Sequence, residues 1–557
     1  MNKGKYKNIL TAEVFSKKYV LAVSESNVYT IDEFNQWLAE GGYDLIDFED
    51  YRFGENKGLF SPDGRGISFN YVTFPPCDVS FKGAEFEGHY VSFCEATFGE
   101  GDVDFSGSKF IGREVVFSDT TFSSGRVSFE NAVFDVEDFV FSELTFESGV
   151  SFSCAVFNAD YKSFSRNKYG QGLVDFSHTT FADGEVYFSR SCFGLAGVHF
   201  YEAAFGDGVI EFRNCSFGRN NTLFCDVLFG KGGVYFVDST FEGGGIDFSN
   251  AKFGDGGVDF SGAKLNTPIF SFKNATFGEG DLVLAPKYFQ DGIIDLSYVR
   301  CAGRMFLSGI SGFSGNIYLE SAEFGAEVKV SSSVDESVYR HHRKPTPLLG
   351  SISFNSAKFE KGLVAEGSYR CPIDFRNTDI KGHFSLDNFN VELQRRGPFY
   401  RRVAICDQSA GRFRRLKDLA DQARNKELSL QFHASELKAL RWHHQGAIDS
   451  ILDMIYSGVC DYGRSVARPL ITLGFLTLLC GLYYSGWSLE KIKPAADLSL
   501  ANAFPYLSKG QAKESLGLLN PGLKGSFIYT LVRVGQGFGS SILLFLTGLG
   551  LRNRFRV

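Results

Sequence analysis

The sequence lacks the cysteine spacing of a disulfide framework or of a common zinc site. Its 11 cysteines are odd in number and scattered, and they form no Cys-x-x-Cys pair. We therefore expect free thiols in a reducing compartment. The first 21 residues lack a continuous apolar core because five lysines interrupt them, so we expect no signal peptide. These absences favour a cytosolic location for most of the chain.

Phenylalanine, in contrast, is abundant, with 59 copies in 557 residues. From Phe81 to Leu296 a bulky apolar residue, nearly always Phe, recurs at alternating gaps of five and seven. The series begins with Phe81, Phe86, Phe93, Phe98, Phe105, Phe110, Phe117 and Phe122. It is interrupted over residues 167–172 and resumes at Phe176. The repeat unit is therefore twelve residues, and a fixed period of this length indicates a solenoid.

The residue two positions before each Phe also follows a rule. It is Val or Ile after the long gap and a small residue after the short gap, as in Val103 and Ala84. Residues i−2 and i of a strand point to the same side, so the pattern predicts very short strands with both side chains facing inward. An amphipathic helix needs spacings of three and four, and the Gly-rich gaps would break one.

Three segments carry a family resemblance: Phe-Ser-Gly-Ala-Lys-Leu at 260–265, Phe-Ser-Asn-Ala-Lys-Phe at 248–253 and Phe-Lys-Asn-Ala-Thr-Phe at 272–277. They resemble pentapeptide-repeat proteins. The resemblance implies an all-β, right-handed quadrilateral β-helix with Leu or Phe and a small i−2 residue stacked inside. Here every second side is stretched to seven residues, and two twelve-residue units would make one coil.

We predict four segments along the chain. Residues 1–60 form an N-terminal cap with a helix over about 31–40, where Thr30 and Glu33 match a capping box. Residues 61–390 form the β-helix. Residues 391–460 form a basic neck with helices at about 411–424, 427–444 and 448–459, in contrast to the acidic repeats. Residues 461–557 form a membrane module.

Two polar stretches within the repeats, Tyr161–Gly172 and Val334–Leu349, are expected to leave the rod as loops. The second contains a cluster that is a candidate docking patch for an acidic partner or lipid head groups. Its residues are Arg340, His341, His342, Arg343 and Lys344. The alternative is an ordinary solvated loop.

The C-terminal region contains two apolar segments. Pro469–Trp487 holds no charge over nineteen residues, and a second segment lies at about 526–551. Arginines flank the outer ends of both, whereas the loop between them has five lysines and no arginine. The positive-inside rule favours both ends in the cytoplasm. We therefore expect a multi-pass protein of the inner (cytoplasmic) membrane, with the N-terminal β-helix and the C-terminus in the cytoplasm.

Four polar residues of the second apolar segment are pore-lining candidates. Arg533, Gln536, Ser540 and Thr547 lie at offsets 0, 3, 7 and 14, which places them on one helical face. An arginine at membrane depth is costly and often marks a functional interior. The alternative for Arg533 is that it snorkels to the interface.

The segments 462–469 and 551–556, together with a short helix expected at 498–507, resemble the two-span pore module of potassium-type channels. The resemblance covers about residues 411–557 and implies a homo-oligomer, plausibly a tetramer. The loop between the spans has no Thr-x-Gly-Tyr-Gly filter, so potassium selectivity is not implied.

No catalytic constellation is recognisable, so we expect no enzyme, no cofactor and no metal. His433 shares a helix face with Glu436, and His443-His444 follow, but no third ligand is spaced to join them. Exposed helix histidines are the expected outcome. The recurring aspartates of the repeats face solvent as surface charge.

Two functions remain open at this point. The preferred one is a cytosolic β-helix that acts as a binding or sensing platform, coupled to an oligomeric two-span module that forms a weakly selective ion pore or perturbs the membrane. The alternative is a non-conducting, membrane-tethered scaffold, or an acidic rod that mimics DNA and binds a nucleic-acid enzyme. Expected partners are membrane lipid, further copies of the chain and an unknown cytosolic protein, without direct nucleic-acid binding.

Overall fold

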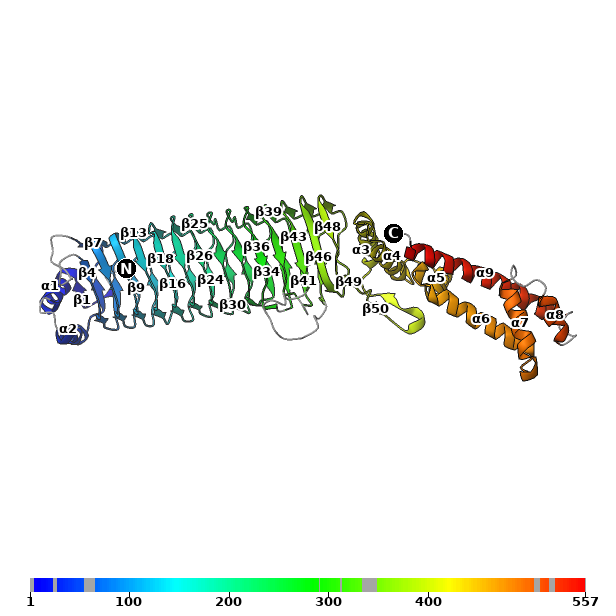
Figure 1. Cartoon of the computed structure of the whole chain (residues 1–557). Helices are drawn as coiled ribbons and strands as arrows, with labels where there is room; N and C mark the ends of the chain where they lie inside the picture. Colours follow the sequence, from blue (N-terminus) through cyan, green and yellow to red (C-terminus); the bar gives the residue numbers. More distant parts are fainter. Residues whose placement is uncertain are drawn as a thin grey trace. The chain divides into compact units, whose positions relative to one another are not determined.

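The chain forms two compact units, residues 1–392 and 393–557, in a computed structural model. The structure describes residues 5–23, 28–54, 66–289, 291–310, 313–332, 348–504, 511–519 and 526–555. The first unit is a parallel β-solenoid in which short strands stack as successive rungs (Figure 1). The second unit is mainly helical. The predicted β-helix followed by helices is confirmed.

The rungs of the solenoid form four faces, each a ladder of parallel strands. The first face contains β1 (Ile9–Thr11), β2 (Leu45–Asp47), β6 (Asp78–Ser80), β9 (Val103–Asp104), β12 (Val127–Ser128), β16 (Val150–Ser151), β20 (Val174–Asp175), β24 (Val198–His199), β28 (Thr222–Leu223), β31 (Ile246–Asp247), β34 (Ile269–Ser271), β38 (Ile293–Asp295), β41 (Asn316–Tyr318) and β44 (Ser351–Ser353). The second contains β3 (Arg52–Phe53), the first halves of β7 (Glu85–Ser92) and β10 (Lys109–Val116), β13 (Val133–Asp135), β17 (Val156–Phe157), β21 (Thr180–Phe181), β25 (Ala204–Phe205), β35 (Thr276–Phe277), β39 (Arg300–Cys301), β42 (Glu323–Phe324), β45 (Lys358–Phe359) and β47 (Asp379–Ile380).

The third face contains β4 (Gly66–Ser68), the second halves of β7 and β10, β14 (Asp138–Val140), β18 (Tyr161–Ser163), β22 (Glu185–Tyr187), β26 (Ile210–Glu211), β29 (Val234–Tyr235), β32 (Val258–Asp259), β36 (Leu282–Leu284), β40 (Met305–Leu307), β43 (Val328–Ser331), β46 (Gly362–Tyr369) and β48 (His383–Ser385). The fourth contains β5 (Thr73–Phe74), β8 (Thr97–Phe98), β11 (Thr121–Phe122), β15 (Thr145–Phe146), β19 (Lys168–Tyr169), β23 (Cys192–Phe193), β27 (Ser216–Phe217), β30 (Thr240–Glu242), β33 (Lys264–Asn266) and β37 (Tyr288–Phe289), and β49 (Phe389–Val391) pairs with the end of β46.

The register shows that two twelve-residue units make one coil. Phe86 pairs with Phe110, which lies 24 residues later, and Phe110 pairs in turn with Phe134. The Phe86 and Phe110 rings stack with centroids 4.5 Å apart and planes 1° from parallel. Small i−2 residues such as Ala84 are fully buried beside the rings. Burial of each ring contributes roughly 1.5–3 kcal/mol, so the Phe columns are the core of the unit.

The five-residue corners depend on a left-handed residue two positions after the Phe that precedes the short gap. Glu95 has φ of 55° and Arg190 has φ of 63°, and the same position recurs along the solenoid. The amide of Ala96 donates to the carbonyl of Phe93 and closes such a turn at 3.1 Å. Positive φ at the third residue of a β-turn turns the chain within few residues, at a steric cost for non-glycine residues.

The stretch 161–172 does not leave the rod, so its prediction as a loop is wrong. Tyr169 occupies the Phe place and stacks between Phe146 and Phe193, each at 5.3 Å. Lys162 occupies the Val place, in register with Phe139 and Val186. The Phe rhythm therefore continues here with substituted side chains.

Polar groups inside this coil are hydrogen-bonded. Asn167 takes the small i−2 place, and its side-chain amide donates to the carbonyls of Phe141 at 2.8 Å and Phe164 at 3.0 Å. The Lys162 ammonium donates to the backbone carbonyl of Asp183 at 3.0 Å. Burial lowers the pKa of Lys162 to about 8, although Asp160 and Asp183 partly oppose the shift.

The insertion predicted at 334–349 falls mostly outside the described residues. Asn316 pairs with Ser351, so 35 residues rather than 24 separate successive strands of the first face here. The predicted docking patch, Arg340 to Lys344, lies outside the described residues. The coil resumes with Phe354 and Phe359, as the sequence predicts.

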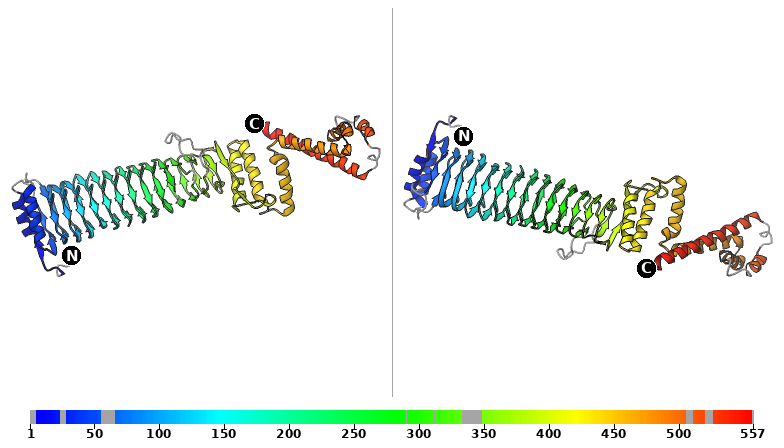
Figure 2. Two further views of the ribbon diagram at one scale, coloured as in Figure 1. Left: turned by 90° about the horizontal axis from the view of Figure 1, so that it is seen from below. Right: turned by 90° about the horizontal axis from the view of Figure 1, so that it is seen from above.

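Two helices cover the N-terminal end of the solenoid (Figure 2). These are α1 (Ala12–Val23) and α2 (Val28–Glu40), of which the sequence predicts only the second. Phe15 of α1 is fully buried and packs edge-on against Phe34 at 5.2 Å and Phe48 at 5.0 Å. The helices therefore shield the terminal Phe rings from water.

The second unit begins with a small hairpin, β50 (Arg395–Arg396) and β51 (Val403–Ala404). Three helices follow: α3 (Ser409–Gln422), α4 (Lys426–Leu440) and α5 (Ala447–Cys460). α3 and α4 pack as a hairpin around Phe413 and Phe432, both fully buried. Asn425 caps α4 by accepting from the amide of Leu428. These helices agree with the predicted neck.

Candidate functional site

Two helices are long and apolar enough to cross a bilayer. They are α6 (Ala467–Ser485) and α9 (Phe527–Phe555), close to the predicted spans. Only 22% and 28% of their most apolar stretches are buried inside the protein, whereas the core helix of a soluble domain is mostly buried. Exposed apolar side chains on both helices need a non-aqueous neighbour. The arrangement fits a membrane-anchored repeat protein.

α6 and α9 pack antiparallel. At one end, the Asn553 side chain donates to the carbonyl of Gly463 at 3.2 Å, just before α6 begins. At the other end, the rings of Tyr484 and Tyr529 lie 5.7 Å apart. Arg464 and Arg468 therefore lie at the same end of the pair as the last turn of α9, which carries Arg552 and Arg554.

A third helix, α7 (Ile492–Ala503), packs against both spans. The Ser499 hydroxyl donates to the carbonyl of Thr477 at 2.6 Å. Thr477 lies nine residues after Arg468, or about 14 Å along the helix, which is about half of a 30 Å hydrocarbon core. α7 thus reaches the middle of the span. The predicted short helix at 498–507 overlaps only its second half. A further short helix, α8 (Gln511–Leu518), follows.

A buried polar network joins the three helices. The Gln536 side-chain amide donates to the Ser499 carbonyl at 2.9 Å and to the Ser499 hydroxyl at 2.7 Å. The Tyr484 hydroxyl donates to Gln536 Oε1 at 3.0 Å, and the Asn502 amide approaches the Tyr484 hydroxyl at 3.5 Å. The network holds α7 between α6 and α9. In a bilayer it would also satisfy these polar groups within the protein.

The predicted pore-lining residues divide into two sets. Gln536, Ser540 and Thr547 lie on the buried face of α9, and the Thr547 hydroxyl donates to the carbonyl of Leu543 at 2.8 Å. The buried Ser540 hydroxyl has no hydrogen-bond partner among the described residues. Arg533 is exposed, and the described part of the chain offers it no ion pair. Their role in lining a pore stays a prediction.

Arg533 and Arg552 mark the two ends of an uncharged stretch of α9. They lie 19 residues apart, and the intervening residues 534–551 carry no charge. In an α-helix this separation is about 28 Å, close to the thickness of the hydrocarbon core. This spacing favours the interfacial alternative for Arg533, with its guanidinium near the head groups.

A buried charge cluster connects the neck to the first span. Arg441 pairs with Asp453, and its guanidinium donates to the Tyr462 hydroxyl at 2.7 Å. The Tyr462 hydroxyl donates in turn to Asp453 Oδ2 at 2.8 Å. Burial and the hydrogen bond to Asp453 raise the pKa of Tyr462, although Arg441 opposes the shift. Both Asp461 and Tyr462 have positive φ, so a sharp turn separates α5 from α6.

Sequence reasoning missed the residues that hold α7. Ser499 and Asn502 lie three positions apart in α7, which also carries the exposed charged residues Lys493 and Asp497. The i, i+3 spacing of the two polar residues was the available signal. His433 lies 3.7 Å from Glu436, as the shared face predicts, but Arg414 also binds that carboxylate at 2.7 Å.

Comparisons with protein-family models, curated proteins and solved structures found no match to this chain.

Proposed function

We propose that this chain is a subunit of an oligomeric membrane assembly that forms a weakly selective ion pore or otherwise permeabilises the bilayer, with the solenoid as its cytosolic binding or sensing platform. The observation that carries this proposal is the packing of α7 between the spans, where Ser499 contacts Thr477 near the middle of α6 and Gln536 of α9. A simple anchor needs no third helix at that depth. Broken or short helices at mid-depth are typical of proteins that conduct or transport.

Oligomerisation follows from the number of spans. Two spans and one short helix cannot enclose a pore, so several copies must assemble around an axis. The outer faces of α6 and α9 support such contacts, since Gly474 and Gly535 have no neighbouring atoms within 4 Å of a Cβ position. Small residues allow the backbones of adjacent helices to approach closely in a membrane.

The proposed location is the cytoplasmic membrane, with both ends of the chain in the cytoplasm. The support is the placement of Arg464, Arg468 and Arg552 at one end of the antiparallel pair. Arginines next to the span ends favour the cytoplasmic side. The amphipathic helix α5 exposes Ile448, Ile451 and Ile455 just before this end, which suits a position in the head-group region.

A non-conducting scaffold is the second candidate. The burial of Gln536, Ser540 and Thr547 within one chain supports this candidate. A tethered rod would then present its acidic surface to a cytosolic protein, including a nucleic-acid enzyme that accepts a DNA-like shape. The solenoid without residues 461–557 should retain such binding, whereas a pore would lose all effect.

Ion flux separates the two candidates. The full-length protein is reconstituted in liposomes loaded with a potassium- or proton-sensitive dye, and flux is compared with empty vesicles. A pore predicts flux that falls in Gln536→Leu, which removes the bonds to α7, and persists in the matched control Ser541→Ala on the exposed face. Absence of flux across a range of salts, pH values and membrane potentials would reject the pore and leave the scaffold.

A further inference from the structure

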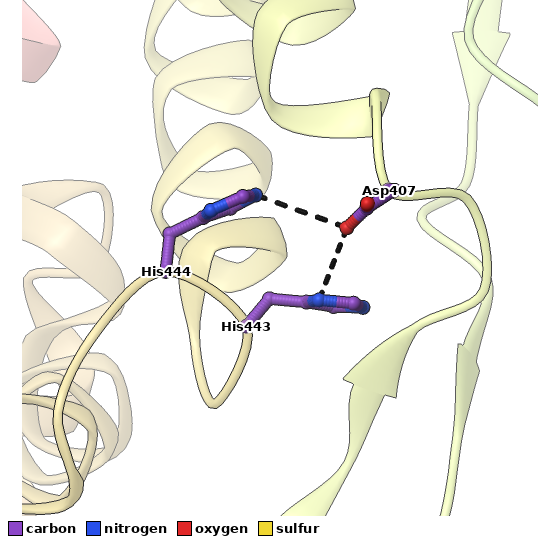
Figure 3. A group of neighbouring side chains, drawn as sticks. All are labelled: Asp407, His443 and His444. Atoms are coloured by element: carbon purple, nitrogen blue, oxygen red, sulfur yellow. Dashed lines mark ion pairs between the residues drawn. The ribbon is translucent and has the colours of Figure 1, made fainter.

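Three side chains of the neck converge on one point, outside the membrane helices (Figure 3). Asp407 lies in the turn between β51 and α3, and His443 and His444 lie in the turn after α4. His443 Nδ1 is 3.0 Å from Asp407 Oδ1, and His444 Nε2 is 3.8 Å from the same oxygen. All three candidate ligand atoms lie within 4.8 Å of one another. The third ligand that the sequence spacing does not reveal is therefore Asp407.

The segments that carry these three residues are held in place by packing and backbone hydrogen bonds. A small apolar cluster of Ala404, Ala410 and Ala439 holds the end of the β50–β51 hairpin against α4. The His444 amide donates to the carbonyl of Leu440 at 3.1 Å, which continues the helix end into the histidine turn. The backbone on both sides of the cluster is thus anchored by packing and hydrogen bonds rather than by the histidine–aspartate contacts alone.

We propose that Asp407, His443 and His444 form a binding site for a divalent transition-metal ion, preferably Zn²⁺. Two imidazole nitrogens and one carboxylate oxygen are a typical donor set for this ion. Zn²⁺ bonds of about 2.0–2.2 Å place tetrahedral ligands about 3.3–3.5 Å apart, between the two distances found here. Hard ions such as Mg²⁺ and Ca²⁺ are disfavoured because they prefer an all-oxygen shell.

The site provides three protein ligands and is open to solvent. The Asp407 side chain is 70% exposed and that of His444 is 54% exposed. A bound ion therefore keeps at least one position for water or an external ligand. It also cross-links the hairpin at residues 395–404 to the end of α4, which adds a constraint on the neck between the solenoid and the first span along the chain.

Metal titration of the full-length protein in detergent tests this proposal. After removal of metal with a chelator, Zn²⁺ alone is titrated by calorimetry, and Co²⁺ substitution is followed by its visible absorption. We expect one ion per chain, at least tenfold weaker binding in Asp407→Asn, and loss of the site in the double variant His443→Ala/His444→Ala. His433→Ala on α4 is the matched control and should bind like the parent.

The result does not depend on pore activity, because binding is measured directly. Circular dichroism of each variant verifies that the surface substitutions leave the fold unchanged. Binding that is absent in the parent, or that has the same stoichiometry and affinity in the double variant, would overturn the proposal. A single His444→Gln variant with at least tenfold weaker binding would support it even if the double variant failed to fold.

Discussion

The Gln536 side chain on α9 donates a hydrogen bond to the Ser499 hydroxyl on α7 at 2.7 Å, and both side chains are buried. The Ser499 hydroxyl donates in turn to the carbonyl of Thr477 on α6. The network therefore joins three helices through side chains that no apolar residue can replace. It is the feature that separates this module from a plain helical hairpin anchor.

Substitution of Gln536 tests the contribution of this network to stability. Gln536→Leu leaves the Tyr484 hydroxyl without its acceptor and removes both bonds to Ser499, so we expect a loss of about 1–3 kcal/mol. The measurement is thermal unfolding of the full-length protein in detergent, followed by helical circular dichroism. Ser541→Ala, which removes an exposed hydroxyl that donates to the carbonyl of Gly537 at 2.8 Å, should be neutral. Equal stability of both variants would contradict the docking of α7.

The position of Arg533 predicts how α9 inserts. An interfacial Arg533 predicts that Arg533→Leu changes the insertion free energy by less than about 1 kcal/mol. Phe538→Arg, five residues deeper on the exposed face, should cost more than this, up to the value of about 2.5–3.5 kcal/mol for the helix centre. A glycosylation-based insertion assay of the α9 segment measures both. If Arg533→Leu improved insertion as much as Phe538→Arg impaired it, Arg533 would lie at membrane depth.

Lys162 predicts a pH dependence of solenoid stability. Its pKa is about 8 in the folded protein, below the ordinary value near 10.5, so the unfolded chain binds more protons between these values. The buried Lys162 ammonium therefore lowers the free energy of unfolding below pH 8. This loss of stability becomes smaller as the pH rises toward 10.5. Lys162→Val should raise the unfolding temperature at pH 7, and the difference from the parent should shrink by pH 9.5. An unchanged difference between those pH values would contradict a buried ammonium.

The left-handed backbone at the corners predicts that a glycine substitution there stabilises the solenoid. Arg190 is exposed and has φ of 63°, so Arg190→Gly relieves steric strain and should stabilise the solenoid by about 0.5–1 kcal/mol. Lys264 is also exposed but lies in strand β33, where glycine should destabilise by a similar amount. Denaturant unfolding of the two variants measures this difference in sign. A loss of stability in both would show that the corner has no strain to relieve.

The sequence predicts the solenoid because its period is long and regular, and each repeated Phe is buried. It fails at Tyr169, since the interpretation required Phe and not merely an aromatic ring at that place. Lys162 was misleading for a physical reason: a charged residue in a polar stretch usually lies in a loop, and only the register with Phe139 and Val186 places it inside. A substituted position inside a repeat is therefore recognised from the strand register and not from the sequence pattern alone.

The two candidate sites were predictable to different degrees. The spans follow from uncharged runs of sufficient length. The depth of α7 depends on contacts between residues far apart in the chain, such as Ser499 and Gln536, which periodicity does not encode. Asp407 lies 36 residues before His443, and only the packing of the β50–β51 hairpin against α4 brings them together.

The depth of α7 in the bilayer is the most direct test of this account. Leu500 is half-exposed on α7, so Leu500→Trp in a Trp487→Phe background reports depth by quenching with lipids brominated at defined positions of the acyl chain. The two remaining tryptophans, Trp37 and Trp442, lie outside the spans and supply a constant background. We predict stronger quenching by bromines in the deeper half of the acyl chain than by bromines next to the head groups. Quenching confined to the head-group region, or none above background, would contradict the membrane module described here.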